Sequence, residues 1–220
     1  MLRAYILGIE KKDRFWYNIQ YNQSFGGITK MTICLIRHGE TDWNVIGRLQ
    51  GREDIPLNEN GMLQAEQCGK VLSKRNWNAI ITSPLLRARQ TTDIIADILK
   101  IKEVHENYDL VERDYGKASG LLESERKELF PDGKYEGIEN WDIMRDRVCG
   151  AIIKSADMFY PENIIIISHG SAINSVLAEL SNHTIGTGKT KLKNACINLF
   201  SYAEKSLKME LYNISHNEFF

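Results

Sequence analysis

The chain has 220 residues, of which 43% are hydrophobic and 26% are charged, and its formal net charge is −1 at pH 7. These values are typical of a soluble globular protein that is long enough for a substantial core. A charge so close to zero excludes global steering toward nucleic acid or a membrane surface, and no apolar stretch approaches the roughly 18–20 residues of a membrane span. We expect neither as a partner, so any anion site must come from locally placed cations.

The cysteines are scattered along the chain without a C-x-x-C pair, at Cys34, Cys68, Cys149 and Cys196. Two of them, Cys34 and Cys196, lie inside apolar runs, as core residues do. This usage predicts reduced thiols and a cytoplasmic protein.

Residues 1–30 differ in character from the remainder of the chain. They are aromatic and basic, and their apolar patch at residues 4–9 is too short and badly flanked for a secretory signal. We interpret them as an N-terminal extension, and our hypothesis is an upstream over-extension of the reading frame, with one domain over residues 31–220. Mass spectrometry of the native protein tests this, since an intact 1–30 segment would contradict it.

Two apolar runs end in the same way, and they organise the predicted fold. Residues 33–36 are followed by Arg37-His38-Gly39, and residues 164–167 are followed by Ser168-His169-Gly170. Continuous β-branched runs of this kind are typical of strands buried on both faces of a parallel sheet. Because ligands collect outside the carboxyl ends of such strands, we expect the two imidazoles to face one pocket. We also expect Gly39 to let the chain turn and a ligand approach the backbone.

Helices and further strands alternate with these two runs. After a loop over residues 44–56, Asn58 is expected to cap a helix that runs to about Lys74 and buries Met62. A strand over residues 79–82 precedes a helix capped by Ser83, which begins at Pro84, runs to about Leu99 and carries Arg87 in its first turn. Further elements are expected as a strand at 104–108, a short helix at 122–129, a long helix at 138–159, a helix at 171–180, and a terminal hairpin of 195–202 with 208–214. The alternation predicts an α/β fold with a mainly parallel sheet.

Five segments resemble the histidine phosphatase superfamily, which is also called the phosphoglycerate mutase-like family. They are RHGETDWN (37–44), GRLQGREDIPLNENGMLQA (47–65), TSPLLRARQT (82–91), LVERDYG (110–116) and ISHGSAI (167–173). They occur in the family's order and spacing and cover roughly residues 32–215. The resemblance implies a three-layer α/β/α sandwich, and it implies that family members begin close to Met31.

The residues at the two strand ends suit phosphoryl transfer. Arg37, Arg87 and His169 are predicted to hold the oxygens of a phosphoryl group, with help from the N-termini of the helices after Thr82 and His169. His38 would attack phosphorus and form a phosphohistidine that water later cleaves. Neighbouring guanidinium groups should keep this imidazole neutral and nucleophilic.

Other assignments depend on the resemblance. It implies that Glu112, in LVERDYG, is the general acid, and that Asn44, Gln50, Gly51 and Gly170 line the phosphate pocket. For Asn44, Gln50 and Gly51 an ordinary loop role remains open. The S-P-L-x-R spacing selects Arg87 over Arg89, which we expect to face solvent. Thr41 is expected to bond locally, and no functional role is predicted for His105, His183 or His216, which lie outside the motifs.

Other phosphate chemistries do not fit the spacing. The segment GTGKT (186–190) resembles the end of a P-loop, but His183 stands where that motif needs glycine. No cysteine has an arginine six positions later, and paired Asp/His sets for a two-metal phosphatase are absent. We expect no metal and no cofactor.

Three functions remain open. We favour a metal-independent phosphatase acting on a small phosphorylated metabolite. A cofactor-dependent phosphoglycerate mutase is the alternative, although only about 25 residues separate Gly116 from the long helix, where mutases of the family carry a longer insertion. A non-catalytic phospho-ligand binding domain is a third, which the intact set of expected catalytic residues disfavours. The sequence predicts no particular oligomeric state.

Overall fold

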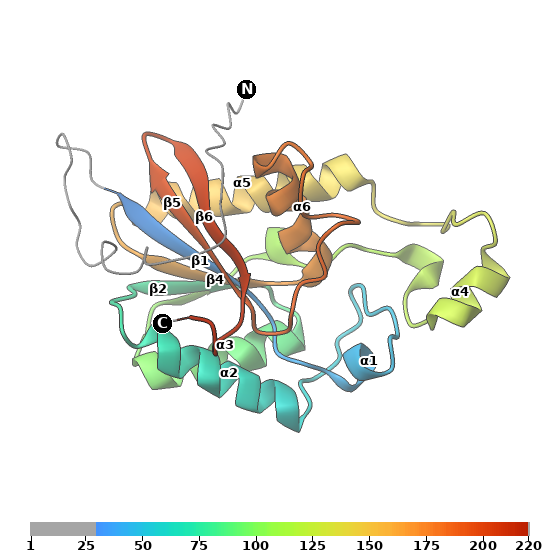
Figure 1. The fold of residues 1–220 in the computed structure, drawn as a ribbon, viewed down its shortest axis with the longest axis horizontal. Helices are drawn as coiled ribbons and strands as arrows, with labels where there is room; N and C mark the ends of the chain where they lie inside the picture. The colour runs from blue at the N-terminus through green and yellow to red at the C-terminus, as the bar shows by residue number, and fades with distance from the viewer. Residues whose placement is uncertain (1–29, 220) are drawn as a thin grey trace.

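The computed structural model describes residues 30–219, which form a six-stranded sheet with helices on both faces (Figure 1). The strands are β1 (Met31–Arg37), β2 (Ala79–Thr82), β3 (Val104–Glu106), β4 (Ile164–Ser168), β5 (Ile197–Ala203) and β6 (Ser206–Ile214). Their order across the sheet is β3-β2-β4-β1-β5-β6. The first four strands pair in parallel and β5 runs antiparallel to both neighbours, so only β5 is reversed. The prediction of a mainly parallel sheet is confirmed.

The helices are α1 (Asp42–Val45), α2 (Glu59–Leu72), α3 (Leu86–Leu99), α4 (Glu123–Leu129), α5 (Trp141–Phe159) and α6 (Gly170–Leu180). Figure 1 shows α2 and α3 on one face of the sheet and α5 and α6 on the other. Within residues 30–219, no helix is long and apolar enough to cross a bilayer. The interpretation of residues 1–30 as an extension concerns residues that, apart from Lys30, lie outside the described part of the chain.

Two buried clusters explain the three layers. On the α5 and α6 side, the central strands contribute Ile33, Leu35, Ile164 and Ile166. On the α2 and α3 side, the same strands contribute Cys34, Ile36, Ile165 and Ile167. Successive side chains of a strand point to opposite faces, so an uninterrupted apolar run fills both cores. The α/β/α sandwich implied by the resemblance is confirmed.

Some predicted boundaries were wrong. Helix α2 is capped by Asn58 as expected, but Met62 is 40% exposed, because Gly61 instead faces inward against the chain. Helix α3 begins at Leu86 rather than Pro84, and the buried Ser83 side chain bonds to His169. Three further differences are small: α1 lies where a loop was expected, β3 ends at Glu106, and α5 begins at Trp141.

A crossing of two backbones places the loop after β1. A Cβ at Gly39 would overlap the Gly61 carbonyl, and a Cβ at Gly61 would overlap the Glu40 backbone. At the position of the missing Gly39 side chain, the first turn of α2 approaches the backbone. This contact fixes the direction in which the chain leaves β1. The expected approach of a ligand to Gly39 stays a prediction.

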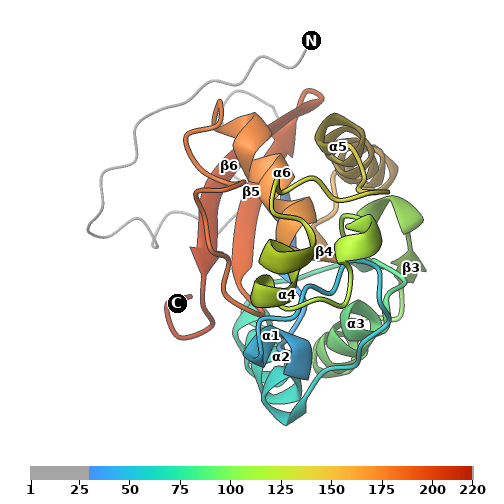
Figure 2. The same ribbon diagram turned by 90° about the vertical axis from the view of Figure 1, so that its right-hand side faces the viewer.

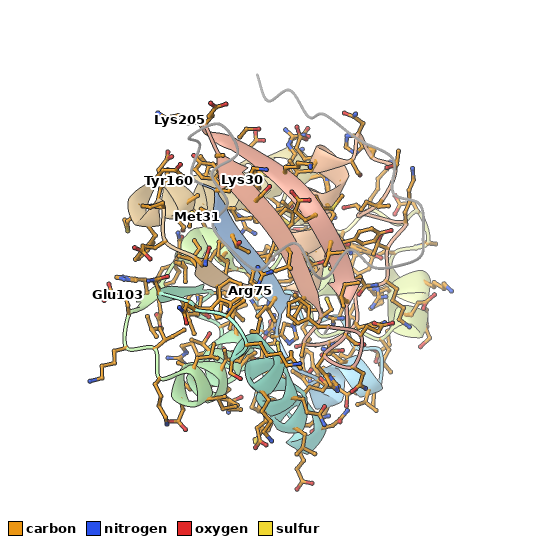
Figure 3. All side chains as sticks on the ribbon, turned by 60° about the vertical axis from the view of Figure 1, so that its left-hand side comes forward. Lys30, Met31, Arg75, Glu103, Tyr160 and Lys205 are labelled. Carbon is orange, nitrogen blue, oxygen red and sulfur yellow. The ribbon has the colours of Figure 1, made fainter. Side chains whose placement is uncertain are left out.

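The carboxyl ends of β1 and β4 lie side by side, with Arg37 opposite Ser168 in the parallel register. Figure 2 views the molecule from this end, where α1 and α4 lie over the strand ends. Figure 3 shows the opposite end, where Met31 begins β1 and where Glu103 and Tyr160 precede β3 and β4. The topology therefore brings the residues after β1 and β4 to one edge of the sheet.

Candidate active site

Two imidazole rings meet at the strand ends. The ring centroids of His38 and His169 are 5.2 Å apart, and both side chains are buried. The backbone amide of His38 donates to the Ser168 carbonyl at 3.0 Å, so the two segments are also joined directly. The prediction that these rings share one pocket agrees with this geometry.

The partners of His38 define which nitrogen can react. Its Nδ1 lies 2.7 Å from the Gly39 carbonyl oxygen, which can only accept, so Nδ1 carries the proton. The unprotonated Nε2 accepts from Arg87 Nε at 3.3 Å. Burial and then the charges of Arg87 and Arg37 hold the pKa of His38 well below its usual value. The ring is therefore neutral at physiological pH, with its lone pair on Nε2.

Arg87 is fixed by backbone carbonyls of the loop before α2. Its Nη1 donates to Glu53 O at 2.7 Å and its Nη2 donates to Gly51 O at 2.8 Å. Burial lowers the pKa of Arg87 to about 10, which leaves the guanidinium charged at neutral pH. Arg89 is 44% exposed and pairs with Glu106, so the structure places the two arginines as the spacing predicts.

Three predicted site residues have a buried polar atom without a hydrogen-bond partner among residues 30–219. One atom is the acceptor Gln50 Oε1, and the other two are Arg37 Nε and His169 Nδ1. Arg37 is held by Nη1, which donates to Leu192 O at 2.6 Å, and His169 Nε2 lies 2.7 Å from Ser83 Oγ. Burial lowers the pKa of Arg37, and burial followed by the charge of Arg87 lowers that of His169. Because unpaired buried polar groups are costly, these two atoms fit an incoming anion.

The orientation of the Asn44 amide is also fixed. Its Oδ1 accepts from the Thr41 backbone amide at 3.1 Å, from Thr41 Oγ1 at 3.1 Å and from Asn194 Nδ2 at 3.1 Å. A backbone amide can only donate, so this atom must be the oxygen. Asn194 also donates to His38 O at 3.4 Å, which fixes its own orientation. Asn44 is thereby left with Nδ2 as a donor for an anion, and Thr41 bonds locally as predicted.

Glu112 occupies the N-terminus of α6. Its Oε1 accepts from the backbone amides of Arg113 at 2.9 Å, Ser171 at 3.1 Å and Ala172 at 3.0 Å, and its Oε2 accepts from Ser171 at 3.0 Å. The Glu112 carboxylate therefore takes two amides of this helix end, those of Ser171 and Ala172, and the expected help from α6 to a ligand stays a prediction for the Gly170 amide.

The first amide of α3 is taken in a similar way. The Leu86 N–H donates to Asp54 Oδ1, so a side chain from the preceding loop holds it. The role of this helix end toward a ligand stays a prediction that can no longer include the Leu86 amide. In both helices, carboxylates of the chain satisfy donors that the sequence pattern assigned to an anion.

Arg37 and Glu112 face the same space above Gly170. A Cβ at Gly170 would stand 3.6 Å from Arg37 Nε and 3.7 Å from Glu112 Oε2. Gln50 is buried with Oε1 unpartnered within the described chain. Gly51 has φ +52 and contributes its carbonyl to Arg87. Contacts of this kind bring eight of the nine predicted site residues together, and Gln50 adjoins them through its chain neighbour Gly51.

Sequence reasoning missed four residues that hold the site. Ser83 and Asn194 contact His169 and Asn44, and the hydroxyls of Tyr115 and Ser171 are 2.5 Å apart beside Glu112. Burial raises the pKa of Tyr115 to about 12, so it is a neutral phenol. Ser83, Tyr115 and Ser171 lie inside the quoted motifs and had a signal there, whereas no motif surrounds Asn194.

The remaining candidates lie elsewhere. His105 contacts Glu103 and Phe159, and His183 contacts Ala178 and Lys189, so neither is joined to the site, and the four cysteines are free. Among residues 30–219, no group of three or more His, Cys, Asp or Glu side chains is arranged to hold a metal ion. The described site is thus a buried, cationic cluster of two histidines and two arginines, with the Glu112 carboxylate beside Arg37.

Comparisons with known proteins agree with this geometry. The profile of the histidine phosphatase superfamily (branch 1) matches residues 33–215. A phosphatase of Bacillus subtilis (strain 168), uncharacterised and called PhoE, is 39% identical over 183 residues, which are 83% of this chain and 94% of the relative. A metal-independent phosphoserine phosphatase of Arabidopsis thaliana is 31% identical, over 84% of this chain and 82% of the relative.

The chain is also similar to a protein that is named as a mutase rather than as a phosphatase, and to a solved structure. A probable phosphoglycerate mutase of Salmonella typhi, GpmB, is 30% identical over 79% of this chain and 86% of its own. The solved structure of Bacillus stearothermophilus YhfR has the same fold, with a TM-score of 0.79 at 24% identity over 84% of this chain and 98% of that chain. Since the profile covers most of the sequence, the chain belongs to the histidine phosphatase superfamily.

Proposed function

We propose that this protein is a phosphatase that hydrolyses small phosphate monoesters through a phosphohistidine on His38. The observation that carries the proposal is the state of that ring: Nδ1 is bound to a carbonyl, Nε2 is unprotonated, and two guanidinium groups adjoin it. A neutral imidazole among fixed cations combines a nucleophile with a site for a dianion.

In the first step, Arg37, Arg87 and the Asn44 amide hold the phosphoryl oxygens. The unpartnered His169 Nδ1 adds a donor if Ser83 donates to Nε2, because the ring then carries its proton on Nδ1. The Nε2 lone pair of His38 forms a bond to phosphorus as the bond to the ester oxygen breaks. Arg87 Nε donates to Nε2 before the attack, and as the new bond forms it donates to a phosphoryl oxygen instead.

Glu112 supplies the proton that the leaving alkoxide needs. Its Oε1 is filled by three backbone amides, whereas Oε2 shares one and faces the space above Gly170. The proton is therefore placed on Oε2. In the second step the resulting carboxylate takes a proton from water as the water oxygen attacks phosphorus and the bond to His38 breaks.

We propose that the reaction needs no metal ion, because two arginines neutralise the charge that a metal would otherwise balance. The Arabidopsis relative described as metal-independent supports this. Activity should survive dialysis against EDTA, and a loss that Mg²⁺ or Zn²⁺ restores would contradict the proposal. The free thiols suit a reducing compartment, so we place the protein in the cytoplasm.

The mutase-named relative is the observation that favours the second candidate, a phosphoglycerate mutase. Only 25 positions separate Gly116 from the start of α5 at Trp141, and they hold one short helix, α4. A panel of phosphorylated metabolites decides between the two, with phosphoserine included and with 3-phosphoglycerate offered together with 2,3-bisphosphoglycerate. Release of inorganic phosphate supports the phosphatase, whereas formation of 2-phosphoglycerate without such release would establish the mutase.

A further inference from the structure

The segment that carries Glu112 is not part of the sheet. Residues 108–110 form a single 3-10 turn, and residues 111–113 continue as irregular chain. The position of the Glu112 carboxylate therefore depends on whatever holds the backbone carbonyls of this segment. One of them, Leu110 O, accepts from Ser168 Oγ at 2.7 Å.

The Arg147 guanidinium contacts three other carbonyls of the segment, and Arg52 Nε also donates to one of them, Glu112 O, at 3.4 Å. Arg147 Nη1 donates to Asp109 O and to Val111 O, both at 2.8 Å, and its Nη2 donates to Glu112 O at 3.1 Å. Arg147 lies in the second turn of α5, so a helix determines the position of the Glu112 segment. The planar fork of arginine suits such a set of carbonyls, and lysine cannot reproduce it.

Glu139 fixes that guanidinium in turn. Its Oε1 accepts from Arg147 Nε at 2.7 Å and its Oε2 accepts from Nη2 at 2.8 Å. The Glu139 and Arg147 side chains are only 9% and 14% exposed. Burial alone would raise the pKa of Glu139, but the hydrogen bonds and charge of Arg147 outweigh it and lower that pKa.

Glu139 also grips the chain on the other side of Glu112. Its Oε2 accepts from the Asp114 amide at 3.2 Å, and its own amide donates to Asp114 O at 2.8 Å. Its carbonyl accepts from Arg113 Nε and Nη2 at 3.0 and 2.9 Å. The pair therefore holds the backbone both before and after the proposed general acid.

We propose that Glu139 and Arg147 are the positioning residues of Glu112, and that their ion pair keeps its carboxyl group within reach of the leaving oxygen. The inference rests on the proposed function, since it takes Glu112 as the acid. Neither residue makes a hydrogen bond to His38 or Arg87, and the charge of Arg147 acts on the pKa of His169, which it lowers as the smallest contribution, rather than on that of His38. Loss of the pair should spare attack on phosphorus and impair proton donation.

The test compares two esters with different needs. The p-nitrophenolate of p-nitrophenyl phosphate leaves without acid assistance, whereas the alkoxide of an alkyl phosphate requires a proton. A misplacement of the Glu112 carboxyl group by about 1 Å can lower the rate by about 10²-fold. For Arg147→Met we expect kcat/KM to fall by roughly 10- to 100-fold with the alkyl ester and by less than about 3-fold with the nitrophenyl ester. Arg147→Lys should show the same selective loss, because it keeps the charge but not the fork.

Arg145→Met is the matched control. Arg145 lies on the same helix and pairs with Asp142 and Asp146, yet it makes no contact with the Glu112 segment. Both esters should be hydrolysed by this variant at the wild-type rate. If Arg147→Met does not fold, the kcat/KM values of the two esters are compared for Arg147→Lys instead. If Arg147→Lys also fails to fold, the pair is structural and the inference is overturned.

A double-mutant cycle separates this inference from the proposed function. In a Glu112→Gln background, Arg147→Met should add no further selective loss, because the acid is already gone. If Glu112→Gln slows both esters equally, the acid assignment itself fails. If Glu112→Gln is selective but Arg147→Met slows both esters equally or neither, the proposed function survives and the positioning role is wrong.

Discussion

Arg87 Nε lies 3.3 Å from His38 Nε2, so a cation of the chain holds the nitrogen that we propose as the nucleophile. A guanidinium beside an imidazole disfavours its protonation and keeps the lone pair available. The same group is anchored to two carbonyls of the loop before α2, so it cannot swing far from the ring. The pair thus joins the first strand to α3 through the reacting atom.

The first prediction concerns the nucleophile. His38→Gln should reduce turnover of p-nitrophenyl phosphate by at least about 10³-fold, because the covalent route is lost. Its circular dichroism spectrum should match that of the wild type. Acid-quenched turnover of a ³²P-labelled ester should yield a labile protein adduct in the wild type and none in the variant. His105→Gln, at an exposed histidine, is the control and should keep full activity; comparable turnover in both variants would remove His38 from its role.

The second prediction is a pH dependence of stability. In the unfolded chain His38 and His169 titrate near 6.5, whereas in the folded chain their pKa values lie well below that. Below pH 6.5 the unfolded state therefore binds protons that the folded state does not. The contribution of these two histidines to the free energy of unfolding should be fully present above pH 6.5, and the free energy of unfolding should fall as the pH decreases below that value.

Urea unfolding at several pH values between 5 and 8 measures this effect. His38→Gln should reduce the slope below pH 6.5 by up to about 1.4 kcal/mol per pH unit, because one such site is removed. Identical slopes in the wild type and this variant would show that His38 protonates equally in both states.

The third prediction concerns Asn194, which donates to Asn44 Oδ1 beside Thr41. In Asn194→Asp a carboxylate would face the Asn44 oxygen, which the Thr41 amide keeps on that side, so repulsion should displace the Asn44 side chain from the anion. Inorganic phosphate should then inhibit about 10- to 100-fold more weakly, as expected for a lost hydrogen bond to a charged group. Asn194→Ala should have a smaller effect.

Asn217→Asp adds the same charge at an exposed position of the C-terminal segment and serves as the control. Its inhibition constant for phosphate should equal that of the wild type. A similar weakening in Asn217→Asp would assign the effect to net charge rather than to the displacement of Asn44.

The fourth prediction concerns the backbone crossing of Gly39 and Gly61. Gly61→Ala should lower the free energy of unfolding by about 1–3 kcal/mol or more, because the new Cβ meets the Glu40 backbone rather than a flexible side chain. Gly150→Ala is the matched change on α5, where a Cβ meets nothing within 4 Å. It should raise the free energy of unfolding by about 0.5–1 kcal/mol through helix propensity. Equal effects in the two variants would show that the crossing tolerates a side chain.

The sequence by itself determined which two strands carry the proposed site and which residues belong to it. Two apolar runs that end in Arg-His-Gly and Ser-His-Gly predict buried parallel strands, and parallel strands bring their carboxyl ends to one edge. The S-P-L-x-R spacing likewise separates the buried Arg87 from the exposed Arg89. Local periodicity and motif spacing suffice for such conclusions because they involve residues close together along the chain.

Only the tertiary structure decided how those residues are held. Asn194 stands 150 positions from Asn44, and Arg147 reaches Glu112 through backbone carbonyls that carry no sequence signature. The Ser171 and Ala172 amides of α6 hold Glu112, because packing places that loop against the helix end. A hydrogen bond between distant segments depends on where the packed cores place their backbones, and a linear pattern does not contain that information.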